Sequence, residues 1–190
     1  QAMAARIRPL DEEIVMAGFA RTGLFREVFH VSPDENPYEL EIKIIDDLKA
    51  DEVVVFGCGG SNRIAPWGEL LTTAAGARGA VGAVTDGFVR DVRSIRRAKF
   101  PVFHGGIAPL DSKGRGKVAE IDVPIACAGV QLESGDLIFG DVDGVVVVPR
   151  KVEEEVLARA FEKVSSENAT RDELLRGAKL KEVYDRYGVL

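Results

Sequence analysis

Two short segments of the sequence combine residue types that could bind and activate a small acid. One is the pair Arg90-Asp91, which follows Asp86-Gly87 at the end of an apolar run. An arginine offers a planar fork of donors for a carboxylate or an enolate oxygen. The adjacent aspartate supplies an oxygen ligand for Mg²⁺ or Mn²⁺, and one or two carboxylates suffice because magnesium keeps several waters. The alternative is structural: Asp91 caps a helix and Arg90 pairs with Asp86.

The second segment, residues 66–71, predicts the start of a helix. Proline is tolerated in a first helical turn, and we expect this helix to cover residues 66–77. The first backbone N–H groups of a helix lack partners and present the positive end of the helix dipole to a carboxylate or phosphate. Gly68 lets a ligand approach the backbone closely. The alternative is an ordinary helix start, in which Trp67 and the two leucines pack into the core.

Other motifs favour structural roles. The glycine-rich loop 57–62 has Asn62 where a dinucleotide fingerprint needs glycine, and it contains no Walker-type sequence. A nucleophilic Cys58 would need a neighbouring base, and a chain with two histidines disfavours a multi-histidine zinc site. Residues 141–144 resemble the opening of a calcium loop, but Val146 and Val152 stand where such a loop needs glycine and glutamate, so the segment is typical of a turn. We expect residues 111–117 to form a mobile surface loop, with substrate gating as the alternative.

The composition is that of a globular protein. The chain has 190 residues, 46% hydrophobic and 29% charged, and we expect residues 1–190 to form a single domain. A net charge of −6 disfavours nucleic-acid binding, which uses concentrated Lys and Arg. Two cysteines cannot build a disulfide framework, and no apolar stretch approaches the ~20 residues of a membrane span. We therefore expect a cytoplasmic protein with neither a membrane nor a nucleic-acid partner.

Hydrophobic periodicity predicts the elements that must position the two segments. Short apolar runs indicate buried parallel strands that alternate with amphipathic helices, as in an α/β sheet. In such sheets ligands gather at the carboxyl ends of the strands, where Arg90-Asp91 would lie. The expected helices and strands in this part are residues 40–48, 53–56, 66–77, 80–84, 92–98 and 101–103.

The two ends of the chain have different patterns. Near the N-terminus, residues 14–17 and 28–31 are expected as two strands separated by Arg21-Thr22-Gly23. Alternating apolar residues and closely spaced turns between residues 118 and 148 predict antiparallel hairpins. Residues 151–175 predict a long charged helix.

Together the motifs resemble the 4-hydroxy-4-methyl-2-oxoglutarate aldolase family, which is related to the regulator of ribonuclease E activity and is often labelled demethylmenaquinone methyltransferase. The similarity is carried by WGELL at 67–71, GAVTDGFVRD at 82–91 and DGVVVVP at 143–149, and it extends over most of the chain from Arg8. It implies a β/β/α sandwich like the phosphohistidine swivelling domain, with a C-terminal helix, assembled as a homotrimer or hexamer. The family's usual N-terminal helix is not in this sequence, so we expect a trimmed chain.

The resemblance also implies a function. It implies a divalent-metal-dependent lyase that cleaves carbon–carbon bonds of small 2-oxo acids through a pyruvate enolate, as an aldolase, an oxaloacetate decarboxylase or both. Arg90 would bind substrate and Asp91 would bind Mg²⁺ or Mn²⁺. Glu69, where characterised aldolases often carry aspartate, and Glu167 from a neighbouring subunit are acids that could assist proton transfer. The backbone contacts to substrate would come from Gly68, Glu69, Leu70 and Leu71.

Two other functions stay open. The chain could be a non-catalytic protein regulator of an RNA-processing enzyme, although such relatives generally lack the acid that follows the arginine, so Asp91 argues for catalysis. A methyltransferase is disfavoured, since the sequence has no glycine-rich nucleotide fingerprint with a ribose-binding acid.

Overall fold

The computed structural model describes residues 1–189, which form two compact units, Gln1–Arg150 and the segment from Lys151 onward. Strands and helices alternate in the first half of the chain, as the sequence predicts. The elements are β1 (Arg8–Pro9), β2 (Met16–Glu27), α1 (Glu39–Asp46), β3 (Glu52–Gly57), α2 (Glu69–Ala77), β4 (Gly82–Val89), α3 (Val92–Ala98), β5 (Val102–Ile107), β6 (Gly116–Ile121), β7 (Ile125–Cys127), β8 (Val130–Leu132), β9 (Leu137–Asp141), β10 (Gly144–Val148), a 3₁₀ turn (Arg150–Val152), α4 (Glu153–Leu175) and α5 (Leu180–Tyr187).

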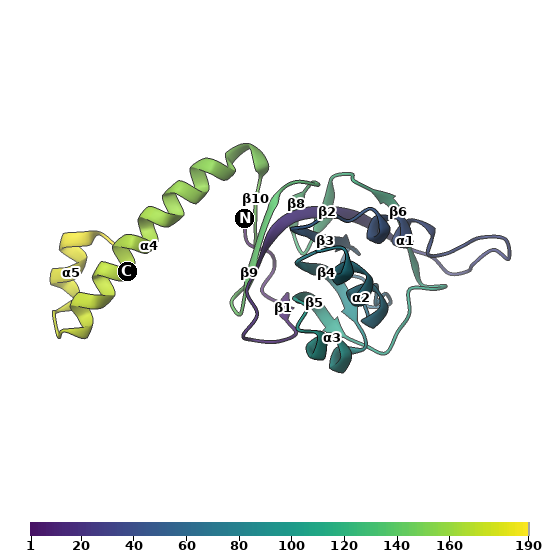
Figure 1. Ribbon diagram of the computed structural model, residues 1–190, viewed down its shortest axis with the longest axis horizontal. Helices are drawn as coiled ribbons and strands as arrows, with labels where there is room; N and C mark the ends of the chain where they lie inside the picture. Colours follow the sequence, from purple (N-terminus) through teal and green to yellow (C-terminus); the bar gives the residue numbers. More distant parts are fainter. Residues whose placement is uncertain (190) are drawn as a thin grey trace. The chain divides into compact units, whose positions relative to one another are not determined.

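An eight-stranded sheet forms the centre of the first unit (Figure 1). Its strand order is β1-β5-β4-β3-β2-β9-β10, and β6 pairs with β2 as a branch. Strands β2 to β5 are parallel neighbours, whereas β1, β6, β9 and β10 pair antiparallel with their neighbours. The parallel centre and the antiparallel hairpin β9–β10 confirm the predicted mixed α/β class.

The sheet is covered on both faces, which explains why residues 53–56 of its central strand β3 are all apolar. Val54 and Phe56 of β3 belong to a core cluster with α1, α2 and α3, whereas Val53 and Val55 belong to a second cluster with β7 and β8. Successive side chains of a strand point to opposite faces. Helices on one face and a small β-layer on the other confirm the predicted β/β/α arrangement (Figure 1).

The N-terminal region differs from the prediction. A single strand, β2, replaces the two expected strands and passes directly through Arg21-Thr22-Gly23, while residues 28–31 lie outside the sheet. The small residues of β2 reflect close neighbours rather than a turn. A side-chain carbon on Gly23, for example, would lie 2.7 Å from the ring of Phe56.

Beyond Thr85, strand β4 changes its neighbour. Its pairing with β3 ends at Thr85, and the segment 64–67 then runs beside it as far as Val89. The Phe88 N–H donates to the carbonyl of Ile64 at 2.9 Å, and the Arg90 N–H donates to that of Trp67 at 3.0 Å. This pairing carries the start of α2 to the end of β4.

Helix α2 therefore begins at Glu69 with Gly68 as its N-cap, three residues later than predicted from Pro66. Trp67 is held in the ladder beside Val89 and is buried, with its ring stacked on Phe100 at a centroid distance of 6.0 Å. A residue held in an extended ladder cannot also begin a helix, which explains the difference.

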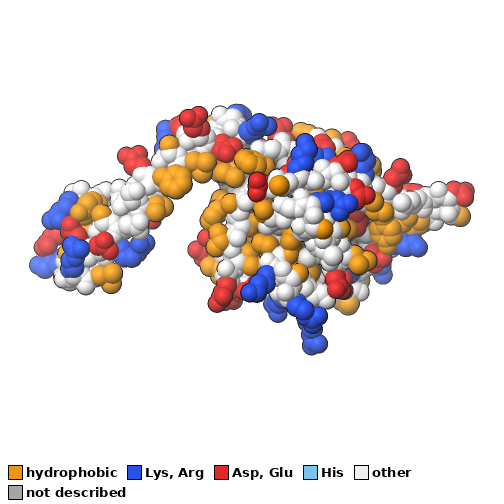
Figure 2. All heavy atoms as spheres, in the orientation of Figure 1, with side chains coloured by type: hydrophobic (Ala, Val, Ile, Leu, Met, Phe, Trp, Pro, Cys, Tyr) orange, Lys and Arg blue, Asp and Glu red, His pale blue; other side chains and the backbone are white. Residues whose placement is uncertain are grey.

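The second unit consists of α4 and α5. The predicted long helix is present as α4, and Glu173 near its end accepts hydrogen bonds from Arg186 and Tyr187 of α5. Apolar side chains along α4, including Phe161 and Val164, are exposed (Figure 2). Within residues 1–189, no helix has the length and apolar character needed to span a membrane.

Candidate functional site

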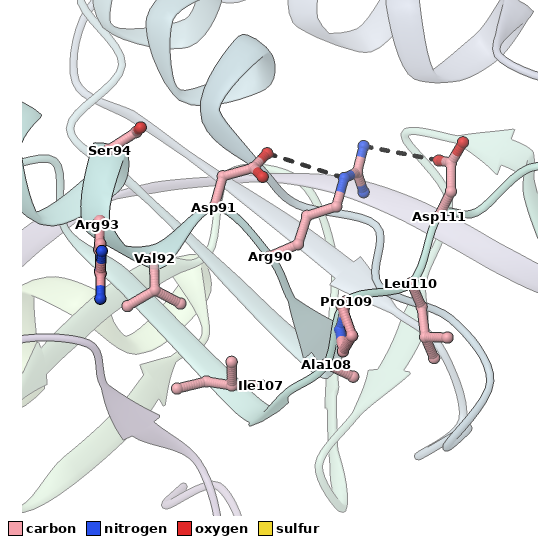
Figure 3. A pocket seen from close by; sticks show the side chains of 10 residues that line it. All are labelled: Arg90, Asp91, Val92, Arg93, Ser94, Ile107, Ala108, Pro109, Leu110 and Asp111. Carbon is pink, nitrogen blue, oxygen red and sulfur yellow. Dashed lines mark ion pairs between the residues drawn. The ribbon is translucent and has the colours of Figure 1, made fainter.

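A pocket of about 670 Å³ lies at the carboxyl ends of β4 and β5. One wall is residues 90–94, where β4 passes into α3, and the other wall is residues 107–111, from the last residue of β5 onward (Figure 3). Arg90, Asp91, Arg93 and Asp111 supply its charged groups, and most of the other lining side chains are apolar. This is the edge of the sheet at which the sequence predicts the Arg90-Asp91 pair.

Asp91 joins the pocket to the start of α2. Its Oδ2 atom accepts a hydrogen bond from the backbone N–H of Glu69 at 3.1 Å. Asp91 is also the backbone N-cap of α3, but its side chain makes no capping bond to that helix. Its φ of 58° is a left-handed conformation that is uncommon for residues other than glycine and often occurs at functional sites. Asp91 therefore does cap a helix, as the structural alternative predicts, but its carboxylate caps α2 rather than the α3 helix that it begins.

Gly68 is required by this close approach. A side-chain carbon at position 68 would lie 2.7 Å from Oδ2 of Asp91 and 3.1 Å from Cγ of Arg90. Contacts shorter than about 3 Å to a carbon atom force one of the groups to move. Glycine at this position thus lets the chain before α2 pack directly against both side chains.

The guanidinium of Arg90 lies between two carboxylates (Figure 3). Its Nε is 3.9 Å from Oδ2 of Asp91, and its Nη2 is 3.6 Å from Oδ1 of Asp111. Its Nη1 donates to the carbonyl of Ala65 at 2.5 Å. Arg90 does not pair with Asp86, so this second half of the structural alternative is also wrong.

Asp111 is held in turn by residues that the sequence did not single out. Its Oδ2 accepts a hydrogen bond from the Tyr38 hydroxyl at 2.7 Å, and its Oδ1 accepts one from the Ser112 N–H at 2.7 Å. Burial alone would raise the pKa of Asp111, but the Tyr38 hydrogen bond, the charge of Arg90 and backbone donors lower it below its ordinary value. Burial and Asp111 raise the pKa of Tyr38 to about 12, so its hydroxyl stays protonated and donates.

The expected mobile loop at 111–117 is wrong for its first residues. Ser112 is only 1% exposed, and its hydroxyl donates to Oε2 of Glu41 at 3.3 Å. Glu41 projects from α1 and is itself 4% exposed. Burial raises the pKa of Glu41 to about 7, although the positive charge of Arg90 opposes the shift. In the sequence, Glu41 lies on the same helix face as the apolar residues Ile44 and Ile45, and this position is the signal from which its burial could have been predicted.

The first turn of α2 faces solvent beside the pocket. The first helical bond of α2 runs from the Thr72 N–H to the Gly68 carbonyl, so the N–H groups of Leu70 and Leu71 precede the helical ladder. Leu71 packs against the core, but Leu70 is 82% exposed. The core-packing alternative therefore holds for Trp67 and in part for Leu71, and it fails for Leu70.

Cys58 and Asp86 belong to the interior rather than to the pocket. Burial raises the pKa of the Cys58 thiol to about 12, and its polar contacts are the Thr85 hydroxyl at 3.5 Å and the Phe56 carbonyl at 3.9 Å. Asp86 accepts backbone hydrogen bonds from Cys58 and Gly60 and thereby fixes the glycine-rich loop. These contacts suit a structural turn and give Cys58 no base.

The acids predicted to assist proton transfer lie in different places. The Glu69 side chain is exposed on the first turn of α2, and the backbone N–H of the same residue donates to Asp91. Glu167 is on α4 in the second unit, where Lys163 pairs with it at 3.5 Å. Its role across a subunit contact stays a prediction.

The donor set around Asp91 fits a hard divalent cation. Within residues 1–189, no group of three or more His, Cys, Asp or Glu side chains is arranged to hold a metal. The Asp91 side chain is nevertheless 45% exposed, and both its hydrogen bond from the Glu69 N–H and its ion pair with Arg90 use Oδ2, so Oδ1 has no partner among residues 1–189. Mg²⁺ and Mn²⁺ prefer oxygen ligands, and magnesium commonly keeps several waters on one or two carboxylates. Asp91 is the residue that would hold such an ion.

A second positive charge adjoins the pocket. Arg93 lines it and is exposed, and α3 also carries exposed Arg96 and Arg97, so that basic side chains gather over this helix (Figure 2). In a chain of net charge −6, this patch is a local positive field that attracts small anions.

The comparisons with known proteins agree with this fold. The family described as RraA-like, Aldolase/RraA, matches residues 1–147. A protein of Halalkalibacterium halodurans with the provisional name 4-hydroxy-4-methyl-2-oxoglutarate aldolase is 35% identical, over 88% of this chain and 75% of its own length. The 4-hydroxy-4-methyl-2-oxoglutarate aldolase of Thermus thermophilus is 32% identical, over 56% of this chain and 65% of its own length.

A solved structure gives the same result. RraAS2 of Streptomyces coelicolor, described as an unusual member of the RNase ES inhibitor RraA protein family, has a TM-score of 0.79 at 27% identity and covers 90% of this chain and 83% of its own. Sequence and fold thus lead to one conclusion: the chain belongs to the RraA-like family of aldolase and RraA proteins.

Proposed function

We propose that this protein is a divalent-metal-dependent lyase that cleaves a carbon–carbon bond of a small 2-oxo acid and releases pyruvate. The observation that carries the proposal is that Arg90 and Asp91 line one pocket and that Asp91 also binds the first N–H of α2, which brings the start of this helix to the pocket's edge. The family names support it, since relatives of this chain are called 4-hydroxy-4-methyl-2-oxoglutarate aldolases. Oxaloacetate and 4-hydroxy-4-methyl-2-oxoglutarate are the candidate substrates.

Arg90 would bind the 2-oxo acid end of the substrate. Its guanidinium is held by the Ala65 carbonyl and by two carboxylates, so its direction is fixed before substrate arrives. The N–H groups of Leu70 and Leu71 would receive a carboxylate at the positive end of α2. Asp91 would hold Mg²⁺ or Mn²⁺, whose chemistry when bound is Lewis-acid stabilisation of charge on the keto oxygen.

In the reaction itself, bond cleavage leaves an electron pair that becomes a pyruvate enolate. Retro-aldol cleavage removes the proton of the substrate hydroxyl, and decarboxylation releases CO₂ instead. In both, Arg90 would stabilise the negative charge that develops on the keto oxygen, and the enolate carbon is then protonated. Glu69 would move these protons, because its carboxylate is exposed on the first turn of α2 beside the pocket.

The pocket favours substrates with a second acid group. Arg90 shares its charge with two carboxylates, whereas Arg93 has no ion pair among residues 1–189 and lines the same pocket. A 2-oxo acid whose second carboxylate points toward Arg93 gains a favourable Coulomb interaction. Both candidate substrates carry such a group.

The test is a coupled pyruvate assay. Purified protein is given oxaloacetate or 4-hydroxy-4-methyl-2-oxoglutarate, with Mg²⁺ or with EDTA, and pyruvate release is followed. We expect metal-dependent turnover that Arg90→Ala abolishes without a change in melting temperature. Arg97→Ala, which removes an exposed arginine of α3 that does not line the pocket, is the matched control. Turnover by Arg90→Ala equal to the wild type, or turnover that survives EDTA, contradicts the proposal.

The second candidate function is a non-catalytic regulator of an RNA-processing enzyme. The observation in its favour is that a structural neighbour is described as a member of an RNase inhibitor family. Asp91 argues against a regulator, because a protein that only binds a partner does not need a carboxylate next to Arg90. Tight binding of a purified ribonuclease, together with no metal-dependent pyruvate release, would make regulation the better assignment.

A further inference from the structure

We propose that Tyr38 and Asp111 are positioning residues for Arg90, and that they keep its guanidinium directed into the pocket rather than folded onto Asp91. This inference rests on the proposed function, because it explains how Arg90 is kept ready for a 2-oxo acid. It concerns two residues outside the Arg90-Asp91 motif: Tyr38 directly precedes α1, and Asp111 lies in the segment after β5.

The contacts form a chain that ends at Arg90. The Tyr38 hydroxyl donates to Oδ2 of Asp111 at 2.7 Å, and Oδ1 of Asp111 is 3.6 Å from Nη2 of Arg90. Figure 3 shows the Arg90 guanidinium between Asp111 on one side and Asp91 on the other. With both carboxylates in place, the arginine is drawn in two directions and stays between them.

The contacts from Tyr38 through Asp111 to Arg90 are anchored in the fold, so they can hold the guanidinium in position. The Ser112 N–H donates to Asp111 at 2.7 Å, and the buried Ser112 hydroxyl donates to the buried Glu41 of α1. Tyr38 is the N-cap residue of the same helix. Two side chains of one helix region thus fix the Asp111 segment, and a long flexible arginine gains a partner that cannot itself move freely.

Asp111 also affects Asp91, because it keeps the Arg90 guanidinium away from the Asp91 oxygens. Nε of Arg90 is 3.9 Å from Oδ2 of Asp91, which is longer than a hydrogen bond. Without the opposing carboxylate of Asp111, only the Ala65 carbonyl would hold the guanidinium, and its Nε and Nη2 would be free to turn onto the Asp91 oxygens that a metal needs. The guanidinium would then also leave the place where a substrate carboxylate binds.

The decisive variant is Tyr38→Phe, because it removes one hydroxyl and changes no charge. We expect kcat/KM for pyruvate release to fall about 10-fold, and the affinity for oxalate, an unreactive planar dianion, to fall by about the same factor in calorimetry. Tyr184→Phe, at an exposed tyrosine of α5, is the matched control and should change neither value. Melting temperatures verify that all variants are folded.

Asp111→Asn separates positioning from simple charge. Removal of a negative charge beside an anion site should by itself tighten oxalate binding, whereas loss of positioning should weaken it. We expect weaker binding, and we expect Tyr38→Phe to have no further effect when combined with Arg90→Ala, since the pair acts through that arginine. Tighter oxalate binding by Asp111→Asn, or an undiminished Tyr38→Phe effect in the Arg90→Ala background, overturns the inference.

The two proposals fail in different ways. If the wild type binds oxalate but releases no pyruvate, the lyase function is wrong and the binding measurements still decide the roles of Tyr38 and Asp111. If the wild type binds no oxalate with or without Mg²⁺, Arg90 is not an anion site and the positioning inference is wrong as well.

Discussion

Asp86 and Asp91 stand near the same end of β4, and the surroundings of their carboxylates are opposite. Asp86 is 6% exposed, and both of its oxygens accept backbone hydrogen bonds, from Cys58 at 2.6 Å, from Gly60 at 2.9 Å and from Ala128 at 3.3 Å. Asp91 is half-exposed and accepts one backbone hydrogen bond, from Glu69. Both oxygens of Asp86 are bound by the protein, whereas Oδ1 of Asp91 has no protein partner among residues 1–189.

The difference shows that the candidate site is marked by a carboxylate whose oxygens are not all bound by the protein, and not by the presence of an aspartate alone. A buried carboxylate surrounded by backbone donors holds loops together, because losing it would leave those donors unpaired. A carboxylate with a free oxygen at a pocket can bind a cation or a substrate proton without breaking the fold. We therefore expect Asp86 to control stability and Asp91 to control activity.

The largest expected effect is on activity at Asp91. Asp91→Asn keeps an oxygen to accept the Glu69 N–H but removes the charge that would hold a divalent ion. We expect kcat/KM for pyruvate release to fall about 1000-fold, which corresponds to about 4 kcal/mol of transition-state stabilisation. Unfolding by urea should show a change in stability below about 0.5 kcal/mol. Normal activity in this variant would remove Asp91 from the site.

The next effect is on stability at Asp86. Asp86→Asn places an amide NH₂ group where one carboxylate oxygen accepts a backbone N–H, so at least one buried donor loses its acceptor. We expect the free energy of unfolding to fall by about 3 kcal/mol, measured by urea titration. Residual activity per folded molecule should stay close to that of the wild type. If this variant instead lost activity and kept its stability, the comparison between the two aspartates would be reversed.

Glu41 extends the comparison to a buried acid that has a hydroxyl donor in place of backbone donors. Burial raises its pKa from 4.5 to about 7 in the folded chain. The unfolded chain releases this proton near pH 4.5, so the stability gained by keeping it is fully present below that pH and is lost as the pH rises through 7. The loss amounts to about 3 kcal/mol.

The measurement compares Glu41→Gln with the wild type by urea unfolding at about pH 5 and about pH 8. The glutamine stays neutral, so the stability of the variant relative to the wild type should rise by about 2–3 kcal/mol between the two conditions. The difference between the two proteins cancels the titration of the other carboxylates. An equal difference at both pH values would mean that Glu41 is ionised in the folded protein throughout.

The sequence predicted local features better than contacts between distant segments. Buried strands such as β3 and the helix at α1 follow from periodic apolar residues, and the Arg90-Asp91 pair was placed correctly at a strand end. The start of α2 was misplaced, because Trp67 pairs with Val89 and this long-range contact outweighs the preference of proline for a first helical turn.

The contacts that Tyr38 and Asp111 add to the site could not be predicted from the sequence. Tyr38 and Asp111 reach Arg90 from separate segments, and neither lies in a motif whose spacing indicates chemistry. The polar composition of residues 111–117 suggested a solvated loop, but tertiary packing buries Ser112 against α1. Such polar pairs become visible only when the fold brings the segments together.

The smallest expected effect tests how closely α2 must approach Asp91. In Gly68→Ala, the added carbon would lie 2.7 Å from Oδ2 of Asp91, so the carboxylate must shift by some tenths of an ångström. We expect kcat/KM to fall about 10-fold, because small displacements of binding groups reduce catalysis. Gly76→Ala in the same helix is the control: its nearest contact is 3.8 Å, and alanine there should stabilise the protein by up to about 1 kcal/mol without changing activity. Equal activities of the two variants would show that Asp91 acts without a fixed distance to α2.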